Sequence, residues 1–109
     1  MQESHLKVLR HLEGHPDITQ RELAHVLGIS LGKANYCLKT LINKGLVKAK
    51  NFKNSNNKHA CLYILTPKGI EVKAKISIKF LRRKINEYEA LKLEIEQLKS
   101  ELKFDNDNS

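Results

Sequence analysis

Residues 19–45 read TQRELAHVLGISLGKANYCLKTLINKG, and this stretch decides the fold. Thr19 and Glu22 have the spacing of a capping box, in which the hydroxyl accepts from the backbone of the first helical turn. Residues 28–30, Gly-Ile-Ser, predict a tight turn whose serine caps a second helix over residues 31–44. Two helices joined by so short a turn are typical of a helix-turn-helix, which we expect from Thr19 to Lys44.

The apolar residues of both helices recur at helical spacing and predict which face of each helix is buried. In the first helix we expect the inward residues to be Leu23, Val26 and Leu27. In the second they are Ala34, Leu38, Leu41 and Ile42, with Leu31 and Cys37 near the boundary. The remaining side chains of the second helix then face outward.

The outward face of the second helix has the chemistry of DNA recognition. Its predicted contact residues are Ser30, Gly32, Lys33, Asn35, Tyr36 and Lys39, with Asn43 on the same face. Gly32 lets the backbone approach closely, and Lys33 suits phosphate or guanine. Asn35 can pair with adenine, and Tyr36 can donate to phosphate or stack. Any one of these residues could belong to a solvated helix face, but the whole set, without an acidic residue, favours DNA contact.

The segments that flank this motif complete a small domain over residues 1–66. A helix is expected from about Ser4 to Glu13. Two strands, 46–52 and 60–65, predict a β-hairpin with a polar tip. The tip residues expected to contact a neighbouring phosphate or the minor groove are Lys53, Asn54, Ser55 and Lys58. This element order predicts a winged helix-turn-helix, and a plain solvated turn is the alternative for the tip.

A single long helix is expected over residues 67–104, because Thr66-Pro67 is a helix start and no proline or glycine follows Gly69. Its apolar residues predict a coiled-coil seam with one break in phase between Tyr88 and Leu91. The seam residues are Ile78, Leu81, Ile85, Tyr88, Leu91, Ile95, Leu98 and Leu102. We expect a homodimer through this seam. The alternatives are a helix that folds back on its own domain or pairs with another protein. Residues 105–109 are expected to be a disordered tail.

Charge is distributed unevenly along the chain, whose net charge is +8. No acidic residue lies between Glu22 and Glu71, an interval that contains several lysines and therefore favours a polyanionic partner. Residues 68–84 are also basic, and either an extended phosphate-binding surface or a solvated face explains them equally well. After Lys84 acidic residues predominate, so this end is not expected to meet DNA.

Other function classes find little support in the sequence. There is no nucleophile–base pair, paired carboxylate or phosphate-binding glycine loop, so no enzyme and no cofactor are expected. The histidines and the two cysteines, Cys37 and Cys61, lack metal-ligand spacing. Redox sensing by Cys37 is disfavoured because the side chain is expected to point inward. Without a signal peptide or membrane-spanning stretch, the expected location is cytoplasmic.

Residues 19–45 resemble the MarR-type winged helix, and Leu46-Val47 and residues 65–69 fit the same pattern. More narrowly, ISLGKANYCLKTLINKGLVKAKNFKNS (29–55) with LTPKGI (65–70) is similar to short MarR-family regulators associated with exopolysaccharide gene clusters. The resemblance implies a cytoplasmic transcriptional regulator that binds double-stranded DNA as a dimer. The first helix is shorter than in typical MarR proteins and the last is single and long, so no small-molecule effector is implied.

The sequence thus predicts a mainly α chain with a small β-hairpin, in which a winged helix-turn-helix precedes a long C-terminal coiled-coil helix. The expected function is sequence-specific DNA binding in transcription regulation. A second hypothesis is a winged-helix protein-interaction module that works through its coiled coil and has little affinity for DNA.

Overall fold

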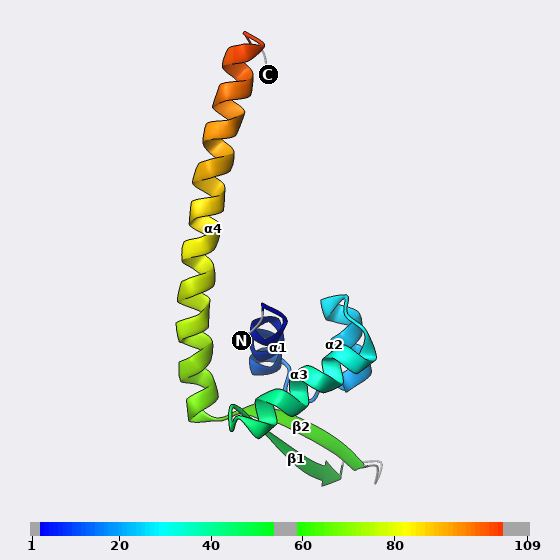
Figure 1. Cartoon of the computed structure of the whole chain (residues 1–109). Coiled ribbons are helices and arrows are strands. Elements are labelled where there is room, and N and C mark those ends of the chain that lie inside the picture. The colour runs from blue at the N-terminus through cyan, green and yellow to red at the C-terminus, as the bar shows by residue number, and fades with distance from the viewer. Residues whose placement is uncertain (1–2, 54–58, 104–109) are drawn as a thin grey trace. The chain divides into compact units, whose positions relative to one another are not determined.

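The structure is a computed structural model of the 109-residue chain, and it describes residues 3–53 and 59–103. Along the chain lie α1 (Glu3–Gly14), α2 (Gln20–Leu27), α3 (Leu31–Asn43), β1 (Val47–Lys53), β2 (His59–Leu65) and α4 (Pro67–Glu101), as Figure 1 shows. The mainly helical fold with one hairpin is the predicted one. The chain divides into two compact units, residues 1–76 and 77–109, and α4 runs from the first into the second.

The helix starts are capped by the hydroxyl side chains that the sequence predicts. Thr19 Oγ1 accepts from the backbone N–H of Glu22 at 3.1 Å, and Ser30 Oγ accepts from that of Lys33 at 3.0 Å. Between α2 and α3, Gly28 adopts a left-handed φ of +66°, which glycine tolerates without steric cost. These local interactions fix the tight turn of the helix-turn-helix.

The core of the first unit forms where α1, α2, α3 and the hairpin meet. Its buried residues are Val8, Leu9, Leu12, Ile18, Leu23, Cys37, Leu38, Leu41, Leu46, Val47 and Tyr63. One predicted inward residue is wrong: Val26 is 55% exposed. Helix α2 instead buries Leu23 and Ala24 and packs Leu27 against the core, so Val26 lies on the flank of that face.

The strands β1 and β2 are antiparallel, with Ala49 opposite Tyr63 at the middle of the pairing. The hairpin is held to the helices by backbone hydrogen bonds. Tyr63 N donates to the carbonyl of Pro16 at 2.8 Å, which joins β2 to the loop before α2. Because this bond and the burial of Tyr63 act together, the strand has a fixed position beneath the helical part of the unit.

The start of α4 is attached to the turn between α3 and β1. Thr66 Oγ1 donates to the carbonyl of Gly45 at 2.6 Å and accepts from the N–H of Gly69 at 3.0 Å. Gly69 is buried, and a Cβ built on it would lie 2.0 Å from the carbonyl oxygen of Leu46. Only glycine therefore permits this close contact between helix and backbone. Further along α4, Lys73 forms an ion pair with Glu13 of α1.

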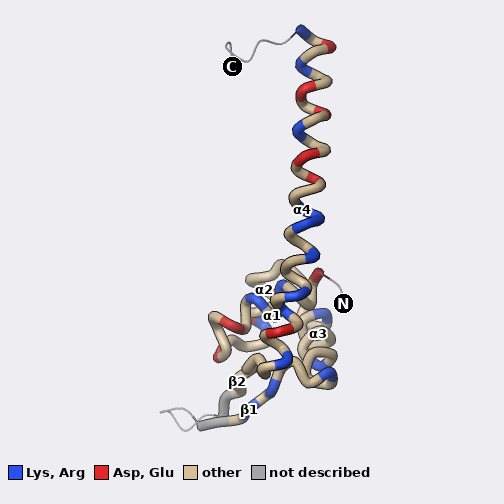
Figure 2. Tube along the Cα trace, turned by 90° about the vertical axis from the view of Figure 1, so that its left-hand side faces the viewer, with Lys and Arg blue, Asp and Glu red and all other residues tan. Residues whose placement is uncertain are grey.

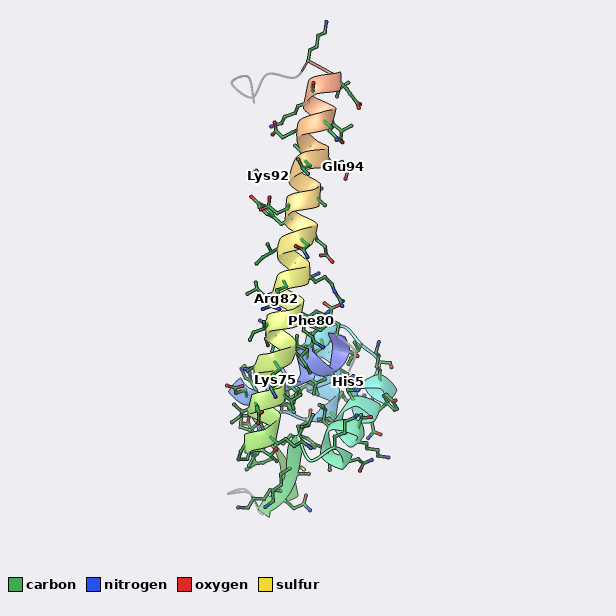
Figure 3. All side chains as sticks on the ribbon, turned by 60° about the vertical axis from the view of Figure 1, so that its left-hand side comes forward. His5, Lys75, Phe80, Arg82, Lys92 and Glu94 are labelled. Atoms are coloured by element: carbon green, nitrogen blue, oxygen red, sulfur yellow. The ribbon has the colours of Figure 1, made fainter. Side chains whose placement is uncertain are left out.

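The second unit contains the rest of α4, in which every described residue is at least partly exposed. Lys92 and Glu94, labelled in Figure 3, are among the charged side chains on this part of the helix. The predicted tail, residues 105–109, and the hairpin-tip residues Asn54, Ser55 and Lys58 lie outside the described residues. Within the described ranges, no helix has the length and apolar character needed to cross a membrane.

Candidate nucleic-acid interface

The outer face of α3 is exposed and carries most of the predicted contact residues. Gly32, Lys33 and Lys39 are exposed, and Tyr36 is 62% exposed. Ser30 and Asn43, at the two ends of the helix, are exposed as well. The first turn of α3 therefore presents a capped N-terminus, a glycine and a lysine to the outside, an arrangement that favours phosphate.

Asn35 does not lie free on this face as the sequence predicts. It is only partly exposed, and its Nδ2 donates to Oε1 of Gln20 in α2 at 3.0 Å. Gln20 in turn donates through Nε2 to the hydroxyl of Tyr63 in β2 at 3.2 Å. Nothing in the spacing of the sequence connects these residues, because the contacts depend on how α2, α3 and β2 pack together.

His5 is a second residue whose position the sequence does not reveal. It is 5% exposed, and neither ring nitrogen has a hydrogen-bond partner among the described residues. Burial lowers the pKa of its imidazole below the ordinary value of 6.5, and the positive charges of Lys44 and Lys33 lower it further. Burial is the largest cause of this lowered pKa, and His5 is labelled in Figure 3.

The charged residues of α3 itself are all basic. In Figure 2 the tube of α3 carries basic segments and no acidic one. On β1, Lys48 and Lys50 are exposed and extend the basic character into the hairpin. Lys53 is the last residue of β1, next to the tip. The basic surface of the first unit, as described, therefore includes α3 together with Lys48 and Lys50 of β1.

The basic stretch at residues 68–84 is partly neutralised. Lys73 is paired with Glu13, Lys75 with Glu71 at 3.0 Å, and Lys84 with Glu87 at 3.3 Å. The guanidinium of Arg83 lies over the ring of Phe80, 4.9 Å from its centroid. These intramolecular contacts favour the solvated-face reading for this stretch, because three of its lysines, Lys73, Lys75 and Lys84, already have acidic neighbours.

The cysteines and histidines show no convergent arrangement. Both cysteines are free, and Cys37 is only 1% exposed, as expected of a thiol that points inward. His11 and His15 stack with ring centroids 4.4 Å apart. Across residues 3–53 and 59–103, no three His, Cys, Asp or Glu side chains gather to form a metal site.

Comparison with known proteins supports the architecture of the interface. Residues 1–48, which include α1, α2 and α3, match the family model of winged helix-turn-helix DNA-binding domains. No curated protein matches the chain in sequence. Solved structures match it far more fully.

Three of these solved structures are the transcriptional regulator SlyA, MarR from E. coli and FabT from Streptococcus pneumoniae. SlyA is 22% identical, with 93% of this chain and 70% of that chain covered and a TM-score of 0.68. Apo MarR from E. coli is 24% identical, with coverage of 90% and 78% and a TM-score of 0.62. The chain has the fold of MarR-type regulators. The FabT protein of Streptococcus pneumoniae, solved in complex with DNA, shares this fold at 16% identity over 100% of this chain and 78% of that chain (TM-score 0.58).

The MarR-type fold assigns places to the predicted elements. Helices α2 and α3 are the helix-turn-helix, and β1 and β2 are the wing. Four of the six predicted helix contacts, namely Gly32, Lys33, Tyr36 and Lys39, are exposed side by side along α3 together with its cap Ser30. Asn35 is the exception, since its amide is shared with Gln20.

Proposed function

We propose that the chain is a cytoplasmic, sequence-specific DNA-binding transcriptional regulator that acts as a homodimer. In this proposal α3 is the recognition helix and the β1–β2 hairpin is the wing. The observation that carries the proposal is the outer face of α3, which is exposed, basic and free of acidic residues from its cap to its end. The match of residues 1–48 to winged DNA-binding domains and the shared fold of the FabT–DNA complex support it.

The chemistry of α3 suits the major groove, where the edges of all four base pairs differ and a helix fits. Lys33 and Lys39 can donate to phosphate or to guanine, and Tyr36 can donate to phosphate or stack on a sugar or base. Gly32 has no atom within 4 Å of a Cβ position, so its lack of a side chain serves no contact within the chain. The absence of a side chain at Gly32 allows the helix backbone to approach DNA closely.

The wing extends the contact along the phosphate backbone. Lys48 and Lys50 on β1 are exposed, Lys53 ends β1, and Asn54, Ser55 and Lys58 follow it in the sequence. Positive and hydrogen-bonding side chains of this kind position a protein on DNA without reading its sequence. We therefore assign phosphate contact to the wing together with the lysines of α3, and base preference to α3 alone.

The homodimer is proposed on the seam of α4. Its eight residues, from Ile78 to Leu102, are between 42% and 76% exposed in the single chain. An apolar row of this length on a solvated helix is unfavourable, and a second copy of the same row would cover it. A two-fold dimer would present two recognition helices to half-sites roughly 34–36 Å apart.

Control of exopolysaccharide genes is the narrowest part of the proposal. Its support is the likeness of residues 29–55 and 65–70 to regulators associated with such gene clusters. Enrichment of the chain's own genomic binding sites at those genes would support it. Enrichment only at unrelated genes would refute it and leave DNA binding untouched.

The direct test of the recognition surface is selection of binding sites from random duplexes, followed by measurement of variants. We expect Lys33→Ala, Asn35→Ala and Tyr36→Ala together to abolish the sequence preference, whereas Lys92→Ala, on exposed helix α4, keeps it. A preference that survives the triple substitution would show that another face reads DNA. Failure of the wild-type chain to bind any duplex would favour the protein-interaction module, with the seam of α4 as its working surface.

A further inference from the structure

Three polar side chains from three elements form one hydrogen-bond chain in the first unit. Gln20 is the first residue of α2, Asn35 lies in the middle of α3, and Tyr63 lies in the middle of β2. Asn35 Nδ2 donates to Gln20 Oε1 at 3.0 Å, and Gln20 Nε2 donates to Tyr63 Oη at 3.2 Å. The chain therefore connects the wing strand to the proposed recognition helix through α2.

The two bonds couple the orientation of the Asn35 amide to that of the Gln20 amide. Tyr63 is 8% exposed and its own backbone N–H is bonded to Pro16, so its hydroxyl is a stationary end of the chain. A flip of the Gln20 amide alone would set its NH₂ group against that of Asn35, donor against donor. A flip of both amides together, with the Tyr63 hydroxyl as donor, is the one alternative that keeps two bonds. In the structure Asn35 donates to Gln20, and Gln20 opposes a flip of the Asn35 amide by itself.

The remaining hydrogen-bonding capacity of Asn35 matches one base edge. An asparagine amide offers two N–H donors and one acceptor oxygen, and Gln20 occupies only one donor. The oxygen and the second N–H are the pair with which asparagine reads adenine, by accepting from N6 and donating to N7. An unheld asparagine would also sample the flipped orientation and other rotamers, which lowers its discrimination between bases.

We infer that Gln20 is a positioning residue for base recognition, which holds the Asn35 amide in the orientation that prefers adenine. This inference rests on the proposed function, since it supposes that α3 enters the major groove. Gln20 itself need not touch DNA. Its effect on binding passes through Asn35, and the phosphate contacts of the lysines are independent of it.

The test compares variants on a duplex obtained by site selection with the wild-type chain. The discrimination ratio is the affinity for that duplex divided by the affinity for the same duplex with each adenine replaced in turn. Asn35→Ala is expected to lower the ratio at one position by roughly tenfold. Gln20→Ala is expected to lower the discrimination ratio at the same position by a smaller factor. When Asn35 is already alanine, adding Gln20→Ala is expected to leave the ratio unchanged. Gln97→Ala removes the same amide from exposed α4 and serves as the matched control.

A conservative variant separates positioning from folding. Gln20→Glu keeps an acceptor for Asn35 and can accept from the Tyr63 hydroxyl, so it is expected to retain more of the ratio than Gln20→Ala, with a lower overall affinity from its negative charge. Thermal unfolding of each variant shows that it is folded under the binding conditions.

The outcomes distinguish this inference from the proposed function. A wild-type chain without sequence preference overturns both. A selective wild-type chain whose Gln20→Ala variant keeps the full ratio overturns the inference alone. So does a Gln20→Ala effect that is as large in the Asn35→Ala background as in the wild type, because Gln20 would then act by another route.

Discussion

The imidazole of His5 packs edge-on against the ring of Tyr36, with ring centroids 6.3 Å apart and an angle of 63° between the planes. His5 is buried on α1, whereas Tyr36 is 62% exposed on α3. A buried residue without hydrogen-bond partners among the described residues thus supports a side chain on the proposed DNA-reading face. The protonation of His5 therefore affects both the stability of the domain and the support of Tyr36.

The first prediction concerns pH. Burial lowers the pKa of His5 in the folded chain, so between that value and about 6.5 the unfolded chain binds more protons. The stability that His5 contributes is complete above pH 6.5 and falls as the pH drops through this window. The slope from one such proton is at most about 1.4 kcal/mol per pH unit.

Denaturant unfolding at pH 7.5 and at lower pH measures this slope. We expect His5→Phe, which keeps a ring against Tyr36, to reduce the loss of stability at lower pH, while His25→Gln at an exposed site of α2 does not. An unchanged slope in His5→Phe would contradict the assignment to His5.

The second prediction concerns the contact between α4 and the end of α3. In Gly69→Ala, the new Cβ would lie 2.0 Å from the carbonyl oxygen of Leu46, which is backbone and cannot rotate away. We expect a loss of roughly 1–3 kcal/mol in the free energy of unfolding. Denaturant titration measures it, and a variant as stable as the wild type would show that α4 does not pack against Leu46 in this way.

The third prediction uses Gly32, a second helical glycine, as the counterpart of Gly69. A Cβ at Gly32 meets nothing within 4 Å, so Gly32→Ala is expected to raise the stability of α3 by about 0.5–1 kcal/mol. If the backbone there approaches DNA, the same variant binds its selected duplex more weakly. Measurement of stability and affinity on one sample separates the two effects. A variant that is more stable and binds equally well would exclude close approach at Gly32.

The fourth prediction concerns the seam. Leu91 and Leu98 belong to it, whereas Leu93 is 66% exposed and lies outside it. Leu91→Lys with Leu98→Lys is expected to give the mass of a single chain by size-exclusion chromatography with light scattering. Leu93→Lys, the matched control, is expected to keep the mass of a dimer. A wild-type chain with the mass of a monomer at micromolar concentration would refute the homodimer.

The features predicted well from sequence depend on neighbours within a few residues. Thr19 and Ser30 cap helices because a hydroxyl three residues before a free backbone N–H can reach it, and Gly28 makes the turn because its φ is positive. The hairpin follows in the same way from period and turn chemistry.

The features that sequence did not predict depend on tertiary packing. Val26 has the spacing of a buried residue, but α2 is short and its apolar residues allow two overlapping faces to be buried. The packing of α1 and α3 against α2 buries the face with Leu23 and Ala24 and leaves Val26 exposed. The bond between Gln20 and Asn35 spans fifteen positions and requires both helices in place. The burial of His5 likewise follows from the packing of α1 against α3, and a histidine in a polar segment gives no sign of it.

The most direct test of the central claim, that α3 binds DNA through a basic face, is the salt dependence of binding to a generic duplex. We expect affinity to fall roughly a hundredfold or more from about 50 to about 200 mM salt. Lys33→Ala with Lys39→Ala is expected to reduce the slope by about two, since each lost phosphate contact lowers it by about one, while Lys92→Ala leaves it unchanged. Absence of binding at low salt would contradict the claim. So would a slope that is unchanged in the variant without Lys33 and Lys39 but reduced in Lys92→Ala.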